Sequence, residues 1–244
     1  MTGKPLGGKN ALVTGAARRI GRAIAKGLAS QGANIALHYR KAEREAESLC
    51  RELKKYNVEC WLLQADFQNR DGYEGLIDAA YDKTGSLDIL VNSASIFPQS
   101  SLQDITWEDL AANIQINAWA PFYISRSFAQ RAGAGVIVNL LDARIGDLDL
   151  KHVAYLLSKQ MLETFTRLLA MELAPRFRVN GVAPGLILPP PGKDDRYLEQ
   201  LIPSIPLKRS GTVESIADAV LFLIMNDYMT GQVIYVDGGR HATR

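Results

Sequence analysis

The chain has 244 residues, 47% of them hydrophobic, and its formal net charge at pH 7 is only +2. This length and composition predict one globular domain with a sizeable core and exclude an intrinsically disordered chain. The small net charge argues against nucleic acid or an anionic membrane surface as a partner.

Short β-rich apolar runs alternate with longer amphipathic stretches along the whole chain. The predicted strands are Asn10–Thr14, Asn34–Tyr39, Cys60–Gln64, Ile89–Asn92, Gly135–Leu140, Arg178–Ala183 and Val233–Val236. The predicted helices are Gly21–Ser30, Glu43–Tyr56, Tyr73–Lys83, Trp107–Arg131, Tyr155–Leu173 and Val213–Met225. Because the strand runs are continuously apolar, they are typical of parallel strands covered on both faces. We therefore predict an α/β fold, a Rossmann-type doubly wound parallel sheet of about seven strands in a single domain over residues 1–244.

The one irregular stretch is 186–209, which holds Pro189-Pro190-Pro191 and a charged segment at 193–196. Loops of that length in a compact domain are usually functional lids or disordered segments. This one follows the carboxyl end of a strand, where ligands bind in open parallel sheets. We therefore predict a substrate lid at about 186–209.

The cysteines and the apolar runs bear on the compartment. Cys50 and Cys60 fit neither a disulfide framework nor a four-ligand zinc site, so we expect a reducing environment and no metal. Residues 1–10 lack the apolar core of a signal peptide, and the longest apolar run, Ala219–Met225, is too short to cross a bilayer. The expectation is a cytoplasmic protein without a membrane partner.

The first strand runs into the first helix through a glycine-containing turn, Thr14–Gly21. Gly15 permits a tight turn, and Gly21 lets the helix pack closely on the sheet. The helix N-terminus then offers free N–H groups and a positive dipole end to a pyrophosphate. Two glycines alone could serve any strand-to-helix turn, but their place in the first βαβ unit favours dinucleotide binding.

Arg19 stands where such loops commonly carry a glycine, directly behind Arg18. Both could be solvated surface arginines. However, cations at a helix N-terminus are disfavoured unless an anion lies between them and the helix. The pair therefore indicates contact with a phosphate or with an anionic edge of the substrate.

The second strand ends in His38-Tyr39-Arg40-Lys41, and no acidic residue occurs before Glu43. Enzymes that use NAD usually place Asp or Glu here to bind the ribose 2′-hydroxyl. Arg40 instead offers a charge-assisted hydrogen bond to a 2′-phosphate. The pattern predicts NADP(H) as the cofactor.

Tyr155 and Lys159 lie four residues apart in a predicted helix and therefore share one face. A free tyrosine, with a pKa of about 10, is a poor acid-base catalyst at neutral pH. A nearby ammonium favours the phenolate and brings the group into a useful range. The spacing is common in ordinary amphipathic helices, so its weight comes from its position after the fifth strand.

Together these features resemble the short-chain dehydrogenase/reductase family along essentially the whole chain. The matching residues, in family order, are Thr14, Gly15, Gly21, Asn92, Asn117, Tyr155, Lys159, Pro184 and Gly185. The resemblance implies that Tyr155 transfers the proton, that Lys159 binds the nicotinamide ribose, and that Asn117 holds a proton-relay water. It also implies a homotetramer built partly on the long helices around Asn117 and Lys159. The implied cofactor contacts are Gly15, Arg18, Arg19, Ile20, His38, Tyr39, Arg40, Asp66, Phe67, Asn92, Ser93, Ala94, Tyr155, Lys159, Pro184, Gly185 and Leu186.

Three departures from the usual family pattern resemble one branch, the pteridine reductases and bacterial dihydromonapterin reductases. Asp142 replaces the serine thirteen residues before Tyr155, Arg19 replaces the loop glycine, and Ser93–Phe97 replaces the usual residues after Asn92. In that branch the residues corresponding to Arg19, Ser95 and Phe97 contact the pterin, and the one at Asp142 works with the tyrosine. Ser93, where Asn is usual, is a mismatch that leaves the local hydrogen bonding open.

A carboxylate beside the tyrosine opposes phenolate formation and can share a proton with the phenol. That suits protonation of a ring nitrogen better than alcohol oxidation, and Phe97 could stack on a flat pterin. Taken singly, Phe97 could be a core aromatic and Asp142 a capping carboxylate. The prediction is an NADPH-dependent reductase that converts a dihydropterin (dihydrobiopterin-, dihydromonapterin- or dihydrofolate-like) to its tetrahydro form.

The sequence leaves two alternative functions open. A ketoreductase such as a 3-oxoacyl carrier-protein reductase shares the fold, but it would be expected to have serine at 142 and glycine at 19. A catalytically idle NADP-binding sensor is the alternative from another class. Tyr155 and Lys159 would be expected to be missing from such a protein, and both are present.

Overall fold

The computed structural model describes residues 3–190 and 192–243; Pro191, part of the predicted lid, lies outside them. The strands are β1 (Asn10–Val13), β2 (Asn34–Tyr39), β3 (Cys60–Gln64), β4 (Ile89–Asn92), β5 (Gly135–Leu140), β6 (Phe177–Pro184) and β7 (Val233–Val236). The α-helices are α1 (Arg19–Ser30), α2 (Glu43–Leu53), α3 (Arg70–Glu74), α4 (Leu76–Thr84), α5 (Trp107–Ile114), α6 (Ala120–Arg131), α7 (Val153–Leu173), α8 (Asp195–Leu201) and α9 (Val213–Met225). Short turns are η1 (Lys54–Tyr56), η2 (Gln115–Trp119), η3 (Ala143–Gly146), η4 (Ile202–Ser204) and η5 (Arg240–Thr243).

All seven strands pair in parallel, in the order β3-β2-β1-β4-β5-β6-β7. The order reverses between β1 and β4, so the carboxyl ends of these two strands flank the position where such sheets bind ligands. The predicted fold class is thereby confirmed, and most strand bounds agree with the prediction to within one residue.

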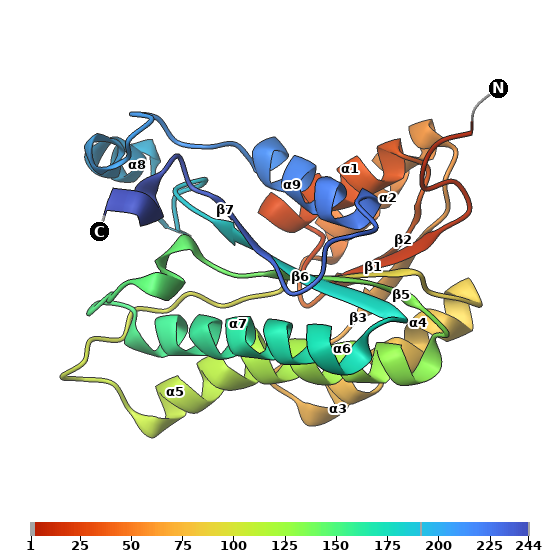
Figure 1. Ribbon diagram of the computed structural model, residues 1–244, viewed down its shortest axis with the longest axis horizontal. Coiled ribbons are helices and arrows are strands. Elements are labelled where there is room, and N and C mark those ends of the chain that lie inside the picture. Colours follow the sequence, from red (N-terminus) through yellow and green to blue (C-terminus); the bar gives the residue numbers. More distant parts are fainter. Residues whose placement is uncertain (1–2, 191, 244) are drawn as a thin grey trace.

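Helices cover the two faces of the sheet (Figure 1), and each face packs into its own apolar core. On one face α1, α2 and α9 pack through side chains such as Ile24, Leu49 and Val220. On the other face α4, α6 and α7 contribute Ile77, Phe128 and Leu169. Continuous burial on both sides explains why the strands read as unbroken apolar runs.

The predicted helices differ from the observed ones at internal breaks. The stretch 73–83 is divided at Gly75 into α3 and α4. The stretch 107–131 is not one helix, because a π-helical turn, η2, interrupts it. The stretch 186–209 contains α8 and η4. The prolines that precede them interrupt the apolar pattern, so the sequence did not predict these helices. Leu198 of α8 packs with Leu186 and Ile205, so this segment has its own small core.

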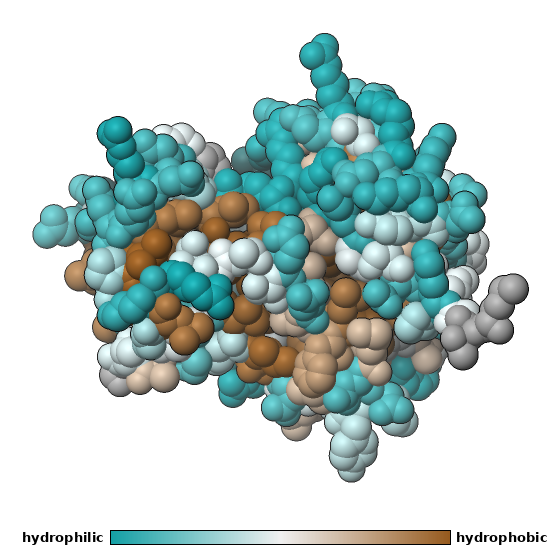
Figure 2. All heavy atoms as spheres, turned by 90° about the horizontal axis from the view of Figure 1, so that it is seen from above, coloured by the Kyte–Doolittle hydropathy of each residue, from teal (hydrophilic) through white to brown (hydrophobic). Residues whose placement is uncertain are grey.

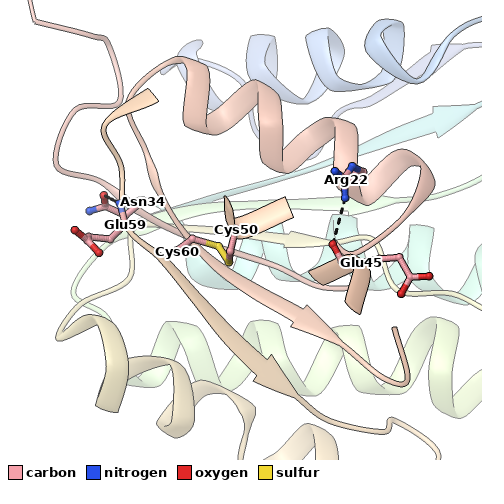
Figure 3. Close-up of a disulfide and its surroundings, with 6 residues drawn as sticks. All are labelled: Arg22, Asn34, Glu45, Cys50, Glu59 and Cys60. Atoms are coloured by element: carbon pink, nitrogen blue, oxygen red, sulfur yellow. Dashed lines mark hydrogen bonds between the residues drawn. A yellow bond between two sulfur atoms is a disulfide. The ribbon is translucent and has the colours of Figure 1, made fainter. Parts of the chain in front are cut away.

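The expectation that the two cysteines stay unpaired is wrong. Cys50 in α2 and Cys60 at the start of β3 form a disulfide, with their Cα atoms 5.4 Å apart (Figure 3). Asn57 takes the left-handed conformation (φ 59°), which ends the η1 turn and reverses the chain between them. With the pair joined, the argument from unpaired cysteines for a reducing compartment loses its basis. Separately, no helix in the described residues is long and apolar enough to cross a membrane.

Candidate active site

The β1–α1 turn is fastened to the end of β4. Gly15 has φ +65°, and a Cβ there would lie 2.9 Å from Ala94 Cα, so only glycine fits. Thr14 Oγ1 accepts hydrogen bonds from the backbone N–H groups of Ser93 (2.9 Å) and Ala94 (3.0 Å). A Cβ on Gly21 would lie 2.3 Å from Gly15 O, so the glycine at 21 is equally required. These contacts fix the two strand ends at the switch point relative to each other.

The His38 side chain is buried and packs against the inner side of this turn. Its Nδ1 accepts a hydrogen bond from Gly15 N–H (3.1 Å), which leaves Nε2 to donate to Ala65 O (3.1 Å). Its ring stacks on Phe67 at 4.5 Å. Burial lowers the pKa of His38 to about 4, although the hydrogen bond to Ala65 opposes the shift, so the ring is neutral. Two predicted cofactor residues, His38 and Phe67, therefore shape the turn from inside.

The N-terminus of α1 has no side-chain cap and no acidic residue in its first turn. Its first N–H groups are therefore available to an anion. Arg18 is ion-paired with Glu45 of α2. Arg19 has a positive φ of 54°, a conformation that favours glycine, and its Nη2 donates to Pro189 O at 2.7 Å. The structure thus brings Arg19 against the segment predicted as a lid.

At the end of β2, Tyr39 is buried and its hydroxyl donates to Glu43 Oε1 at 3.4 Å. Arg40 and Lys41 are exposed, and within 3–190 and 192–243 neither side chain has an ion-pair or hydrogen-bond partner. Asp66, after β3, accepts a hydrogen bond from Gln68 N–H at 3.0 Å. This edge therefore presents unpaired cations beside a turn that offers N–H groups.

Asn92, which is expected to line the cofactor groove, has its side chain buried in the core, 2% exposed. Its amide donates to Asn139 Oδ1 (2.8 Å) and Ser125 Oγ (3.0 Å), and Asn139 donates in turn to Thr166 Oγ1 (2.8 Å). The chain of amides and hydroxyls ties β4 and β5 to α6 and α7. Ser93 and Ala94, whose N–H groups bind Thr14, are the residues that emerge at the turn.

Asp142 and Tyr155 meet although they come from different elements. Asp142 follows β5 and Tyr155 lies in the first turn of α7; the phenol donates to Asp142 Oδ2 at 2.9 Å. Burial, together with the charge of Asp142, raises the pKa of Tyr155 well above its usual value, and Arg144 opposes the shift. The phenol therefore keeps its proton at neutral pH.

Lys159 lies one helical turn after Tyr155 and is 2% exposed. Its Nζ donates to Leu140 O at 2.7 Å and lies 5.8 Å from the centroid of the Tyr155 ring. Burial lowers the pKa of Lys159 to about 8, with the charge of Asp142 opposing part of the shift. Lys159 therefore remains mostly protonated at neutral pH.

Asn117 lies in the π-helical turn η2 and is fully buried. Its Oδ1 accepts from Ile96 N–H (2.9 Å) and Ser95 Oγ (3.0 Å), and its Nδ2 donates to Ser158 Oγ (3.1 Å). Because π-turns often mark functional sites, the break in the helix fits a special role for this residue. Here Asn117 joins the loop after β4 to α7.

Phe97 forms an aromatic wall beside Tyr155. Its ring meets the Tyr155 ring edge-on at 4.6 Å and stacks on the His152 ring at 4.1 Å. The loop that carries Phe97 is held against the start of α7 by a parallel bridge between Ser100 and His152. Three residues not chosen from the sequence join this group, namely Arg144, Asp149 and His152. The only sequence signal for them was a dense run of charges just before the tyrosine.

The end of β6 completes the same edge of the sheet. A Cβ on Gly185 would lie 2.5 Å from Asp237 Cα, so glycine is needed where Pro184-Gly185 passes the segment after β7. Leu186 turns into the small core beneath α8. Figure 2 shows apolar side chains exposed on the left part of the upper face, the end where α8 lies in Figure 1.

Comparison with known proteins places this geometry in a family context. The family described as enoyl-(acyl carrier protein) reductase matches residues 15–241. A 3-oxoacyl-[acyl-carrier-protein] reductase of Staphylococcus aureus is 35% identical, covering 96% of this chain and 98% of that protein. Pteridine reductase 1 of Leishmania tarentolae is 34% identical, with 96% of each chain covered. The structure of FolM alternative dihydrofolate reductase 1 from Brucella canis complexed with NADP superposes with a TM-score of 0.89 at 32% identity, covering 97% of this chain and 95% of that one.

Proposed function

The chain belongs to the short-chain dehydrogenase/reductase family, and on that basis we propose that it is an NADPH-dependent reductase of dihydropterins. It is an oxidoreductase, and its cofactor is NADP(H), the molecule bound in the Brucella FolM structures. The proposed substrate is a class of compounds, because biopterin-, monapterin- and folate-like molecules share the same flat pteridine ring.

The residues present fit the cofactor. The turn at Gly15 and the uncapped start of α1 offer N–H groups to the pyrophosphate. Arg40 is exposed and has no ion-pair partner among the residues that the structure describes, and the next acid along the chain, Glu43, accepts a hydrogen bond from Tyr39. Arg40 would therefore bind the 2′-phosphate, and Lys159 would hold the nicotinamide ribose. When bound, the dihydronicotinamide supplies a hydride.

The single observation that carries the pterin proposal is the 2.9 Å hydrogen bond from Tyr155 Oη to Asp142 Oδ2. It keeps the phenol protonated, so that Tyr155 Oη can deliver a proton to a basic ring nitrogen next to the carbon that is reduced. Asp142 holds the hydroxyl in place and takes part in its reprotonation. Phe97, packed against the Tyr155 ring, offers a stacking face for a flat ring.

The ketoreductase rival rests on a relative of nearly the same identity, 35% against 34% for the pteridine reductase. The site residues favour the pterin, because Asp142 and Arg19 stand where the ketoreductase is expected to have serine and glycine. An idle sensor is disfavoured because Tyr155 and Lys159 are both present, and Lys159 Nζ lies 5.8 Å from the centroid of the Tyr155 ring.

We also propose that residues 186–209 act as the substrate lid and that the protein is a homotetramer. The contact from Arg19 to Pro189 O supports the lid, because it joins the cofactor turn to this segment. Exposed apolar side chains along α5, η2 and α7 support assembly, among them Trp107, Trp119, Leu168 and Met171. A monomer in sedimentation equilibrium would contradict the tetramer.

The test is NADPH oxidation measured with dihydrobiopterin, dihydrofolate and an acetoacetyl thioester side by side. We expect turnover of at least one pterin and little of the thioester. Phe97→Ala should weaken pterin binding by about 1 kcal/mol through lost stacking, with a smaller effect on NADPH. Asp142→Ser should depress pterin reduction. A wild type that reduces the thioester efficiently and ignores every pterin would show that the substrate proposal is wrong, while the reductase fold and cofactor would stand.

A further inference from the structure

Arg144 connects two carboxylates at the site. Its backbone N–H and its Nε donate to Asp142 Oδ1 at 2.8 and 3.2 Å, and its Nη2 lies 3.4 Å from Asp142 Oδ2. Its Nη1 binds Asp149. The side chain is only 17% exposed, so water screens these ion pairs weakly. The guanidinium therefore fixes the same carboxylate to which Tyr155 donates.

The same guanidinium lies against the aromatic wall. Its central carbon is 5.1 Å from the Phe97 ring centroid and 6.0 Å from the Tyr155 ring centroid. Asp149, which is bound to Arg144, also accepts a hydrogen bond from His152 Nδ1 at 2.9 Å. His152 in turn stacks on Phe97. The contacts close a ring from Arg144 through Asp149, His152 and Phe97 back to Arg144.

We propose that Arg144 is a positioning residue that couples the Tyr155–Asp142 proton pair to the Phe97 wall, so that the acid and the stacking surface are set as one unit. The proposal rests on the proposed function, since it assigns a role within that same site. Arg144 acts through its neighbours and does not itself transfer the proton.

The electrostatic consequence has a definite sign. Arg144 lowers the pKa of Tyr155 against the opposing effects of burial and Asp142. Removing the positive charge therefore favours the protonated form of Tyr155. The other titratable or charged groups around the site are Asp149 and His152, Lys159 of α7, and, on η5, Arg240 and His241, the last paired with Asp237.

The experiment compares Arg144→Met, Arg144→Lys and a control, Arg178→Met. Arg178 is a structural arginine whose side chain donates to the carbonyls of Leu223, Ile224 and Met229, away from the site. For Arg144→Met we expect the alkaline limb of the pH profile of kcat/KM, where Tyr155 loses its proton, to move to higher pH by about one unit, and KM for the pterin to rise about fivefold. Arg144→Lys should restore the alkaline limb, while Arg178→Met should lower the thermal midpoint without moving that limb.

A double-mutant comparison tests the coupling. In a Phe97→Ala background, Arg144→Met should no longer raise KM, although it should still shift the alkaline limb. An unshifted alkaline limb together with an unchanged KM in Arg144→Met would reduce Arg144 to a structural residue. If that variant does not fold, Asp149→Asn provides the same test, since it frees one side of the guanidinium and of His152; an unchanged KM there overturns the coupling. If the wild type reduces only the thioester, the pterin proposal fails, while the pH shift measured on the thioester still decides the role of Arg144.

Discussion

Tyr155 is held as an acid by its surroundings. Its hydroxyl donates to Asp142 at 2.9 Å, and burial raises its pKa well above the usual value. The pKa of Lys159 is lowered to about 8, so this side chain is mostly protonated at neutral pH and places a positive charge one helical turn away. The arrangement suits proton delivery better than permanent phenolate formation, because a buried anion beside a carboxylate is unfavourable.

Tyr155→Phe should leave the ring and its contact with Phe97 in place while removing the acid. We expect kcat to fall by at least about 100-fold. NADPH affinity, measured by fluorescence titration, should change little because Lys159 and the glycine turn remain. Turnover within a few-fold of wild type would exclude Tyr155 as the proton donor.

Arg40 decides the cofactor at the level of one side chain. Arg40→Asp should weaken NADPH binding by about 1.5–3 kcal/mol, the usual loss for a charge-assisted hydrogen bond, and should weaken NADH binding much less. Dissociation constants for both nucleotides measure the effect. Lys83→Asp, the same charge reversal at the exposed end of α4, is the control. Equal wild-type activity with the two nucleotides would contradict the assignment of Arg40.

Among elements, the β1–α1 turn combines strain with function. Arg19 is one of three non-glycine residues with positive φ in the described chain, and its guanidinium reaches Pro189 O. A positive φ costs a residue with a Cβ about 1 kcal/mol or more. An unfavourable backbone kept at this place indicates that the side chain has a use there.

Replacing Arg19 by glycine and by alanine separates the two effects. Both variants lose the guanidinium, but only glycine relieves the backbone. We expect Arg19→Gly to exceed Arg19→Ala in free energy of unfolding by about 1 kcal/mol, with KM for the pterin raised in both. Chemical denaturation and steady-state kinetics provide the two readouts. Equal stability of the variants would show that the turn relaxes, and an unchanged KM would remove Arg19 from the substrate site.

The interruption of the α5–α6 segment is a second feature at this scale. Its apolar periodicity predicted one helix from Trp107 to Arg131, but η2 inserts a π-turn that holds Asn117. The Asn117 amide satisfies Ile96 N–H and Ser158 Oγ at once. These partners lie on a loop and on another helix, so the local sequence pattern could not predict the interruption of the helix.

For the whole molecule, the Cys50–Cys60 disulfide joins α2 to β3 across ten positions of sequence. Chain entropy predicts a stabilisation of about 2–3 kcal/mol for a loop of that size. We expect dithiothreitol to lower the free energy of unfolding of the wild type by that amount. Cys50→Ser should match the reduced wild type and not respond to the reductant. Identical unfolding curves with and without reductant would show that the bond contributes no stability.

The sheet also assembles the site. Turns after β1, β2, β4, β5 and β6 all open at the same edge, because parallel strands bring their carboxyl ends together. Residues as distant in sequence as Gly15, Phe97 and Tyr155 can therefore contribute to one site. The fold class followed from the sequence because alternation of apolar runs with amphipathic stretches is a repeated, local signal.

What the sequence by itself determined are properties of single elements and turns. They include the seven strands, the glycines at 15 and 21, the absence of an acid at the end of β2, and the common face of Tyr155 and Lys159. Only the tertiary structure decided which side chains meet: Arg144 with Asp142 and Phe97, His38 beneath the turn, Asn92 in the core, and Cys50 with Cys60. The physical reason is that periodicity records whether a residue faces the core, whereas a hydrogen bond or ion pair depends on the relative placement of elements that the chain brings together from far apart.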